Sequence, residues 1–381
     1  MLNYVSDAMK ILILNSILYT PRINAKGKRE IPCVNSIADC MIIQVAQAFV
    51  NDGHNVTLIA AEDYRPKKEI IYPFDIHYLK STFSKVFLPT ELPLHGELWC
   101  YLKKYGGDFD LVLTSELFSF NSLFAALLCK GKTIVWQESG QHNRKFFRLP
   151  SLVWYNVVAR FLMNKVLVVP RSEVAKRFVK QFNIPINPFI IDHGVNSDIF
   201  KPQLTKEHYF MVIARLDADK NVISIIDKFR RYIESCPQTD FQLHIVGEGN
   251  ERNALQSYVD KFKLNERVHF LGRIPHVELS RRLANATCLF CNSNREFNMI
   301  SIIESICVAT PVLTNKVPYS HEIILKHHLG IAKTDWNEDD IKEIINRNSY
   351  YIEQCIHYMP CLHMSKLPSR FMEASRNFMR L

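Results

Sequence analysis

Short apolar runs rich in β-branched residues alternate with longer amphipathic stretches along the chain. The short runs are typical of buried strands, and the amphipathic stretches have the spacing of helices that cover a sheet. A first series predicts strands at residues 11–15, 56–60, 74–79, 111–114, 133–137 and 166–170, with helices at 36–50 and 121–129 among those between them. Such alternation predicts βαβ units around a parallel sheet.

A second series of the same kind follows a segment with little periodicity. Its strands are predicted at residues 208–216, 241–247, 268–272, 288–292 and 311–315. The intervening segment, 184–207, is rich in Pro, Asn and Asp, which is typical of a connection between domains. Beyond Trp336 the pattern is helical to the carboxyl end.

The two series predict an α/β protein with two Rossmann-like, doubly wound domains that face each other across a cleft. The first domain is expected at 1–190 and the second at 206–345, with a linker at 191–205. Helices at 346–381 are expected to be able to cross back to the first domain. Doubly wound sheets bind ligands at the carboxyl ends of their strands, so we expect a site in the cleft.

The composition is that of an ordinary globular protein. The 381 residues are 48% hydrophobic and 22% charged, which suits two cores and excludes a disordered chain. Ten cysteines lie mostly in apolar runs, which predicts reduced thiols; Cys288 and Cys291 lack the second pair that a zinc site needs. We find no signal peptide and no stretch long enough to cross a bilayer, so we expect a cytoplasmic protein.

Basic residues are concentrated in one segment of a chain whose net charge is +9. Residues 139–172 hold six arginines and lysines and no acidic residue, and aromatic residues lie between them on an amphipathic pattern. One interpretation is a helix that docks on an anionic membrane at its inner face. The other is a core helix with cationic edges. Nucleic acid is not expected as a partner, because predicted strands carry no basic runs with interleaved aromatics.

Candidate chemistry gathers at the strand ends of the second series. Arg215 and Lys220 stand five residues apart across a strand-to-helix turn, where two cations and free backbone N–H groups suit a diphosphate. Gly247 and Gly249 follow the next strand, and we expect them to let a ligand approach the backbone. Arg252 replaces the third glycine of a dinucleotide fingerprint, which argues against a nicotinamide or flavin cofactor.

Two acids follow a later strand of the second series. Glu296 is predicted in the loop after the strand and Glu304 in the next helix, so both can face one cleft. A long ligand would then meet one carboxylate at each end.

Taken in order, these motifs resemble the GT4 family of glycosyltransferases. The resemblance covers most of residues 190–332 and includes "HGVNSDIFKP", "VGEGNER", "RVHFLGRIP", "ATPVLTN" and the "HE" at His321 and Glu322. It implies a GT-B fold and a retaining, metal-independent glycosyltransferase of the kind that builds bacterial surface polysaccharides. Such an enzyme moves a hexose-type sugar from a nucleotide-diphosphate donor to a saccharide, or a lipid-linked saccharide, without a cofactor.

The resemblance also implies roles for single residues. Arg215 and Lys220 would bind the diphosphate, Glu304 the ribose hydroxyls and Glu296 the transferred sugar. The backbone around Arg273 and Ile274 would read the base. The donor pocket would further include four residues that depart from the family's glycine-containing turn: Phe297, Asn298, Met299 and Ile300.

In the first domain, Glu138 and His142 follow a buried strand and are candidates for catalysis or substrate positioning. The acidic motifs at 108–110 and 217–219 allow a different interpretation, a metal site of the GT-A class. Two further alternatives share the nucleotide site: a sugar-nucleotide epimerase of the same architecture and a non-catalytic nucleotide-sugar binding protein.

Overall fold

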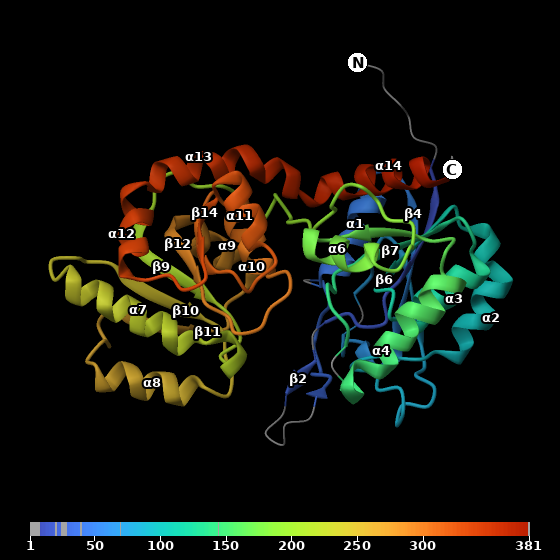
Figure 1. Ribbon diagram of the computed structural model, residues 1–381, viewed down its shortest axis with the longest axis horizontal. Coiled ribbons are helices and arrows are strands. Elements are labelled where there is room, and N and C mark those ends of the chain that lie inside the picture. Colours follow the sequence, from blue (N-terminus) through green and yellow to red (C-terminus); the bar gives the residue numbers. More distant parts are fainter. Residues whose placement is uncertain are drawn as a thin grey trace, which may run out of the picture. The chain divides into compact units, whose positions relative to one another are not determined.

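The computed structural model describes residues 8–19, 21–23, 29–38, 40–68, 70–143 and 145–379 (Figure 1). Residues 1–7 and Arg144 of the basic segment are among those outside the described ranges. The chain divides into two compact units. Unit 1 is Met1–Asp192 with Met364–Leu381, and unit 2 is His193–His363.

Unit 1 is built on a six-stranded parallel sheet with the strand order β5, β4, β1, β6, β7, β8. In chain order these are strands 3, 2, 1, 4, 5 and 6, the arrangement of a Rossmann-type sheet. All six predicted strands are confirmed, as β1 (Lys10–Leu14), β4 (Asn55–Ala61), β5 (Asp75–Leu79), β6 (Leu111–Ser115), β7 (Thr133–Gln137) and β8 (Leu167–Pro170). A small antiparallel pair, β2 (Arg22–Ile23) and β3 (Arg29–Glu30), lies outside this sheet.

Helices cover both faces of this sheet. Successive residues of β1 alternate between the faces: Ile11 and Ile13 pack with α1 and α14, and Leu12 and Leu14 with α2 and α3. This follows from the period of two along a strand. The α-helices of unit 1 are α1 (Met41–Asn51), α2 (Gly96–Tyr105), α3 (Phe120–Leu128), α4 (Leu149–Val153), α5 (Arg160–Leu162), α6 (Glu173–Lys180) and α14 (Leu367–Met379). A π-helix, Trp154–Ala159, joins α4 to α5, and short 3-10 turns span Glu62–Tyr64, Gly106–Asp108, Lys145–Arg148 and Met364–Lys366.

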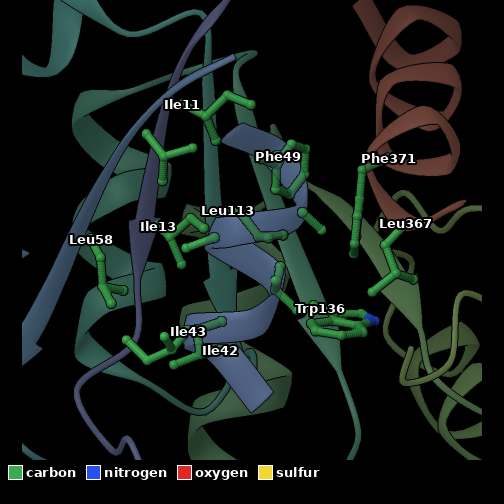
Figure 2. Close-up of a cluster of buried hydrophobic side chains, with 14 of the residues drawn as sticks. Ile11, Ile13, Ile42, Ile43, Phe49, Leu58, Leu113, Trp136, Leu367 and Phe371 are labelled. Carbon is green, nitrogen blue, oxygen red and sulfur yellow. The ribbon is translucent and has the colours of Figure 1, made fainter. Parts of the chain in front are cut away.

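The carboxyl-terminal helix α14 belongs to the core of unit 1. Figure 2 shows Leu367 and Phe371 pointing toward Trp136 and Phe49. The Phe371 ring meets the Trp136 ring edge-on at 5.3 Å between centroids, and the Trp136 indole N–H donates to the Ile191 carbonyl at 2.6 Å. The last segment of the chain therefore completes a core that the first segment began.

Unit 2 repeats the same strand order as β11, β10, β9, β12, β13, β14, again all parallel. The five predicted strands are confirmed as β9 (Glu207–Ile213), β10 (Gln242–Val246), β11 (Val268–Gly272), β12 (Ala286–Cys291) and β13 (Val312–Asn315). Our prediction missed β14 (Gly330–Lys333), a four-residue edge strand with little apolar pattern. The helices are α7 (Val222–Ser235), α8 (Arg252–Lys261), α9 (His276–Asn285), α10 (Ile300–Cys307), α11 (His321–His327), α12 (Glu338–Asn346) and α13 (Asn348–Tyr358), with 3-10 turns at Ala218–Lys220 and Met359–Leu362.

The unit boundaries differ from the predicted ones at both ends of unit 2. Residues 193–205, placed in a linker from the sequence, lie within unit 2, where the Val195 N–H donates to the Leu362 carbonyl at 2.8 Å. The helices expected together at 346–381 are split: α13 packs on the core of unit 2 through Ile352 and Cys355, and α14 joins unit 1. A pattern of apolar positions shows that a helix is amphipathic, but it does not show which core its apolar face meets.

Cys288 and Cys291 lie on opposite faces of β12. Cys288 packs in the core on one side of the sheet and Cys291 in the core on the other, because three positions along a strand reverse the face. Both are free and buried. Over the residues that the structure describes, no helix combines the length and apolar character needed to span a membrane.

Truncating Phe371 tests the role of α14 in unit 1. Phe371→Ala removes a fully buried ring, and loss of burial together with the resulting cavity should lower the free energy of unfolding by about 3 to 5 kcal/mol. Glu373→Ala changes an exposed side chain of the same helix and is the control. Urea unfolding followed by tryptophan fluorescence measures both; equal midpoints for the two variants would contradict this packing.

Candidate functional site

The strand order of unit 2 places two loops next to each other at one edge of its sheet. β9 and β12 are neighbours in the sheet, and the strand order reverses between them. In open parallel sheets the crevice beyond the carboxyl ends of such a pair is the usual ligand position. The loop after β9 carries Arg215 and Lys220, and the loop after β12 carries Glu296.

Main-chain hydrogen bonds join these two loops. The Asn294 N–H donates to the Asp219 carbonyl at 2.8 Å, and the Arg295 N–H reaches the same oxygen at 3.4 Å. The loops are therefore held in register by backbone groups, independently of their charged side chains.

Lys220 and Glu296 form an ion pair across the two loops. The Lys220 ammonium donates to Oε2 of Glu296, and Oε1 accepts from the Phe297 N–H at 3.2 Å. The side chains are only 11% and 17% exposed, so the pair is poorly screened by water. The sequence prediction that these two residues meet at one site holds in the structure.

Arg215 is held beside this pair by two aspartates. Its guanidinium donates to Asp217 at 2.5 Å and to Asp219 at 3.4 Å, and its side chain is 39% exposed. The acidic motif at 217–219 thus positions an arginine in this structure. Arg215 remains accessible to an anion from solution.

Glu304 lies buried in α10 after the same loop. Its residue surface is 8% exposed, and none of the described residues forms a hydrogen bond or ion pair with its carboxylate. Burial raises its pKa to about 7, because a carboxylate removed from water loses hydration that nothing here replaces. A buried acid without a partner is a candidate ligand-binding group.

The residues between Glu296 and α10 form a packed turn. Asn298 and Met299 are buried, while Ile300 at the helix start is 43% exposed. The Phe297 ring lies 5.6 Å from that of Tyr319, and the Phe297 carbonyl accepts from the Tyr319 N–H at 3.0 Å. The turn is thus held by burial of its own side chains and by ring and main-chain contacts with Tyr319.

Gly247 and Gly249 make room for the backbone of unit 2, and their contact with a ligand stays a prediction. A Cβ on Gly247 would stand 1.9 Å from the Ala214 carbonyl oxygen, and one on Gly249 would stand 2.4 Å from that of Leu216. The space at both glycines is thus filled by the loop after β9. The Leu216 N–H donates to the Glu248 carbonyl at 3.0 Å, so this contact fixes the loop that carries Arg215.

Arg273 and Ile274 follow β11 at the same edge of the sheet. The Gly272 carbonyl before them accepts from the Gly247 N–H at 2.8 Å, which ties the ends of β10 and β11 together. Arg273 is exposed and Ile274 is half-buried against the core of unit 2. Their assignment to base recognition stays a prediction.

In unit 1, Glu138 lies in a buried network after β7. Its carboxylate accepts from Arg171 at 3.1 Å, and its N–H donates to Oε1 of Glu116 at 2.8 Å. Glu116 also accepts from the Ser139 N–H at 3.1 Å and the Gln137 amide at 2.9 Å. Burial, and then the nearby charge of Glu138, raise the pKa of Glu116 to about 7.

His142 is half-buried against an aromatic cluster of unit 1, and its assignment to catalysis or substrate positioning stays a prediction. Its ring packs edge-on against Tyr155, Phe178 and Phe182, at 5.1 to 5.8 Å between centroids. Nδ1 forms a hydrogen bond with the Ser151 hydroxyl at 3.0 Å, and burial and then Arg148 lower the pKa of the imidazole. His142 is a packing residue of this aromatic cluster.

Residues 195–348 match the family model described as glycosyl transferases group 1. Unit 2 is a group 1 glycosyltransferase domain. This match confirms the resemblance found from the sequence motifs.

Among relatives, the O-antigen chain mannosyltransferase RfbU of Salmonella typhimurium is 24% identical over 232 residues, 55% of this chain and 63% of that protein. The alpha-monoglucosyldiacylglycerol synthase of Streptococcus pneumoniae is 21% identical over 197 residues, 48% of this chain and 44% of that protein. The matched regions thus span about half to three fifths of these relatives' lengths.

Solved structures resemble the whole chain. The Anabaena protein HepE in complex with UDP aligns with a TM-score of 0.69 and 13% identity over 97% of this chain and 100% of that one. WaaG, a glycosyltransferase of lipopolysaccharide biosynthesis, aligns at 0.61 and 14% identity over 95% and 98%. At such identities the likeness establishes the fold, and it confirms the predicted GT-B class.

Glu116 is a buried acid next to the candidate Glu138 that sequence reasoning missed, and it lies outside the group 1 domain. Its signal was a single acid directly after the buried strand β6, in a left-handed backbone conformation with φ of 64°. Such a conformation is uncommon for residues other than glycine, but the sequence does not reveal it.

Adding a methyl group at Gly247 tests how the group 1 domain holds its loop. Gly247→Ala should lower the free energy of unfolding by more than about 3 kcal/mol, because the new Cβ combines a backbone clash with a φ of 131°. Gly53→Ala is the control: its φ of 90° is also strained, but nothing lies within 4 Å. Gly53→Ala should lower the free energy of unfolding by only about 1 kcal/mol. Urea unfolding compares them, and equal costs would exclude the close approach.

Replacing Glu304 tests its burial through the pH dependence of stability. The folded pKa of about 7 exceeds the ordinary 4.5, so the folded state binds this proton more tightly and loses stability as pH rises from about 4.5 through 7. Glu304→Gln cannot titrate and should be more stable than the parent above pH 7, by at most about 3 kcal/mol, and equal to it below pH 4.5.

Thermal unfolding at several pH values measures this difference. Glu353→Gln removes an exposed carboxylate of α13 and should leave the pH profile unchanged. A Glu304→Gln profile parallel to that of the parent would show that the carboxylate is hydrated in the folded state.

Proposed function

We propose that this chain is a retaining, metal-independent glycosyltransferase that moves a hexose-type sugar from a nucleoside-diphosphate sugar to a saccharide or lipid-linked saccharide. The observation that carries the proposal is the joining of Lys220 and Glu296 at the strand-order reversal of unit 2, with Arg215 beside them. A cation for a phosphate and an acid for sugar hydroxyls are thereby placed next to each other.

Binding of the donor diphosphate exchanges partners at this site. Without ligand, Lys220 is neutralised by Glu296 and Arg215 by Asp217 and Asp219. A diphosphate carries more charge than one carboxylate and offers more acceptor oxygens, so it competes for both cations. Glu296, released from Lys220, is then available to accept hydrogen bonds from hydroxyls of the sugar next to the diphosphate.

The reaction breaks the bond between the anomeric carbon and the diphosphate oxygen, and its electron pair goes to that oxygen. The acceptor hydroxyl oxygen bonds to the anomeric carbon on the same face, and its proton passes to the leaving diphosphate. The products are a glycoside with retained configuration and a nucleoside diphosphate. Charge grows on the diphosphate in the transition state, where Lys220 and Arg215 stabilise it without a metal.

Glu304 accounts for the far end of the donor. Its buried carboxylate has no partner in the described chain and accepts hydrogen bonds at little cost in competing interactions. Ribose hydroxyls suit it, and the backbone at Arg273 and Ile274 meets the base. Because the ionised form accepts more strongly, donor binding should strengthen as pH rises through about 7.

The relatives support a saccharide acceptor at a membrane. One is an O-antigen chain mannosyltransferase and another synthesises a glycosylated diacylglycerol, as their names state. A structural neighbour was solved with UDP. We therefore infer a role in bacterial surface polysaccharide synthesis at the cytoplasmic face of the membrane, and UDP-sugars are the first donors to test.

Donor binding and turnover test the proposal together. Nucleotide sugars that bind should raise the thermal midpoint, and turnover should release nucleoside diphosphate in the presence of EDTA, with retention visible in the anomeric proton coupling of the product. Lys220→Ala should lower kcat/KM by roughly tenfold to a hundredfold, or about 1 to 3 kcal/mol, through loss of a charge-assisted hydrogen bond. Lys201→Ala, an exposed lysine of the same unit, is the control.

The double variant Lys220→Ala/Glu296→Ala separates charge from structure. The single change leaves Glu296 facing the diphosphate without its cation, so removing Glu296 too should restore part of the donor affinity but not the turnover. Donor binding without release of diphosphate would favour a non-catalytic binding protein, and an isomerised free sugar nucleotide would favour an epimerase. Full activity of Lys220→Ala would refute the assigned chemistry.

A further inference from the structure

The helical segment Leu149–Leu162 of unit 1 buries one narrow stripe and exposes an apolar face. The buried stripe is Ser151, Tyr155, Ala159 and Met163, each four residues after the last. Outward lie six apolar side chains that are 38% to 64% exposed: Leu149, Leu152, Val153, Val157, Phe161 and Leu162. A helix on a protein surface ordinarily turns polar residues toward water, so this face is unusual.

The π-helix explains why the arrangement persists along the segment. A stripe of residues four apart drifts around an α-helix, whose period is about 3.6 residues. The wider π turn over Trp154–Ala159 counters this drift and keeps Tyr155 and Ala159 in line with Ser151 and Met163. The apolar residues between them therefore stay on the outer side for the whole length.

A second exposed apolar segment lies beside this helix. Phe83, Val86 and Leu88 are 71%, 74% and 41% exposed in the loop before α2. The loop is anchored next to the helix by rings: Phe87 meets Phe120 at 4.9 Å, and Phe120 meets Trp154 at 5.5 Å. Phe147, just before the helix, is 99% exposed. We call the outward residues of helix and loop together the apolar face.

The charged side chains within the helical segment and the loop 83–88 are all cationic. Arg148, Arg160 and Lys165 are exposed along the helical segment, and Lys85 is exposed in the loop. Residues 139–172 contain no acidic side chain. Apolar side chains among cations complement a surface that is apolar below and anionic above, which is the chemistry of an anionic lipid bilayer.

We propose that the apolar face of unit 1, formed by Phe147, the helical segment 149–162 and the loop 83–88, docks on an anionic membrane. Phe161, Val157 and Phe83 enter the interface, and Arg148, Arg160, Lys165 and Lys85 meet lipid phosphates. The inference concerns a surface and rests on none of the donor residues of unit 2. It deepens the expectation of a membrane partner by naming the residues that touch the lipid.

Vesicle flotation without donor or acceptor tests this surface. The full chain should float with vesicles of equimolar phosphatidylglycerol and phosphatidylcholine, and it should remain in the bottom fraction with vesicles of phosphatidylcholine alone. It should dissociate from the anionic vesicles in about 0.5 M salt. Val157→Ser/Phe161→Ser and Arg160→Glu/Lys165→Glu should each reduce binding at least roughly tenfold. Leu204→Ser/Val277→Ser removes two exposed apolar side chains of unit 2 and should bind like the parent.

Three results would overturn the proposal. The first is that the parent does not float with anionic vesicles. The second is that the parent and both unit 1 variants bind equally. The third is that the chain does not bind lipid but self-associates, and that Val157→Ser/Phe161→Ser abolishes the self-association. The last would show that a second copy covers the face. Thermal midpoints equal to that of the parent show that each variant is folded, and donor-induced midpoint shifts should be unchanged in all of them, which separates this test from that of the proposed chemistry.

Discussion

The reversal of strand order in each parallel sheet is the constraint on which the arrangement of unit 2 depends. Because β9 is central and the chain builds outward from it first on one side and then on the other, the ends of β9 and β12 become neighbours. Lys220 and Glu296 are 76 residues apart in sequence and meet for this reason alone. Helices cover both faces of the sheet, so its carboxyl edge is where polar side chains from different loops can gather.

The charges at this edge are arranged in a way that stability alone does not explain. Glu304 is buried with a raised pKa and no partner among the described residues, which lowers the stability of the folded protein at neutral pH. By contrast, Lys228 in the same unit donates to the Trp336 carbonyl and the Asp335 carboxylate. Where charge serves structure, unit 2 supplies partners. The missing partner at Glu304 is therefore a specific feature of the site. A ligand that hydrogen-bonds to this carboxylate would explain it.

Features that depend on the local pattern of apolar and polar residues were predicted well from the sequence. Features that depend on tertiary packing against other segments were predicted poorly. Eleven of the twelve strands in the two six-stranded sheets were predicted, and Lys220 and Glu296 were correctly expected at one site because both follow buried parallel strands. The backbone approach at Gly247 and Gly249 was not foreseen, because a Gly-x-Gly turn suits a nearby ligand or a nearby backbone equally well and only the fold places Ala214 and Leu216 there. The surroundings of His142 were not foreseen because Tyr155, Phe178 and Phe182, which pack edge-on against its ring, come from segments later in the chain.

The two units differ in how they use the same sheet. At its carboxyl edge unit 2 leaves Arg215 accessible and Glu304 without a partner among the residues that the structure describes. At the carboxyl edge of the unit 1 sheet, the loops after β6 and β7 satisfy each other: Glu116 accepts from the Glu138 and Ser139 N–H groups, and Glu138 is paired with Arg171. Unit 1 instead leaves apolar side chains exposed, on the outer side of the helical segment 149–162, and the π turn keeps these side chains on that side. In the two proposals the donor anion thus binds to unit 2, and the lipid surface binds to an apolar face of unit 1 that is flanked by cations. Such a separation suits a reaction whose donor is a soluble anion and whose acceptor is held at a lipid surface, because binding to one does not compete with binding to the other.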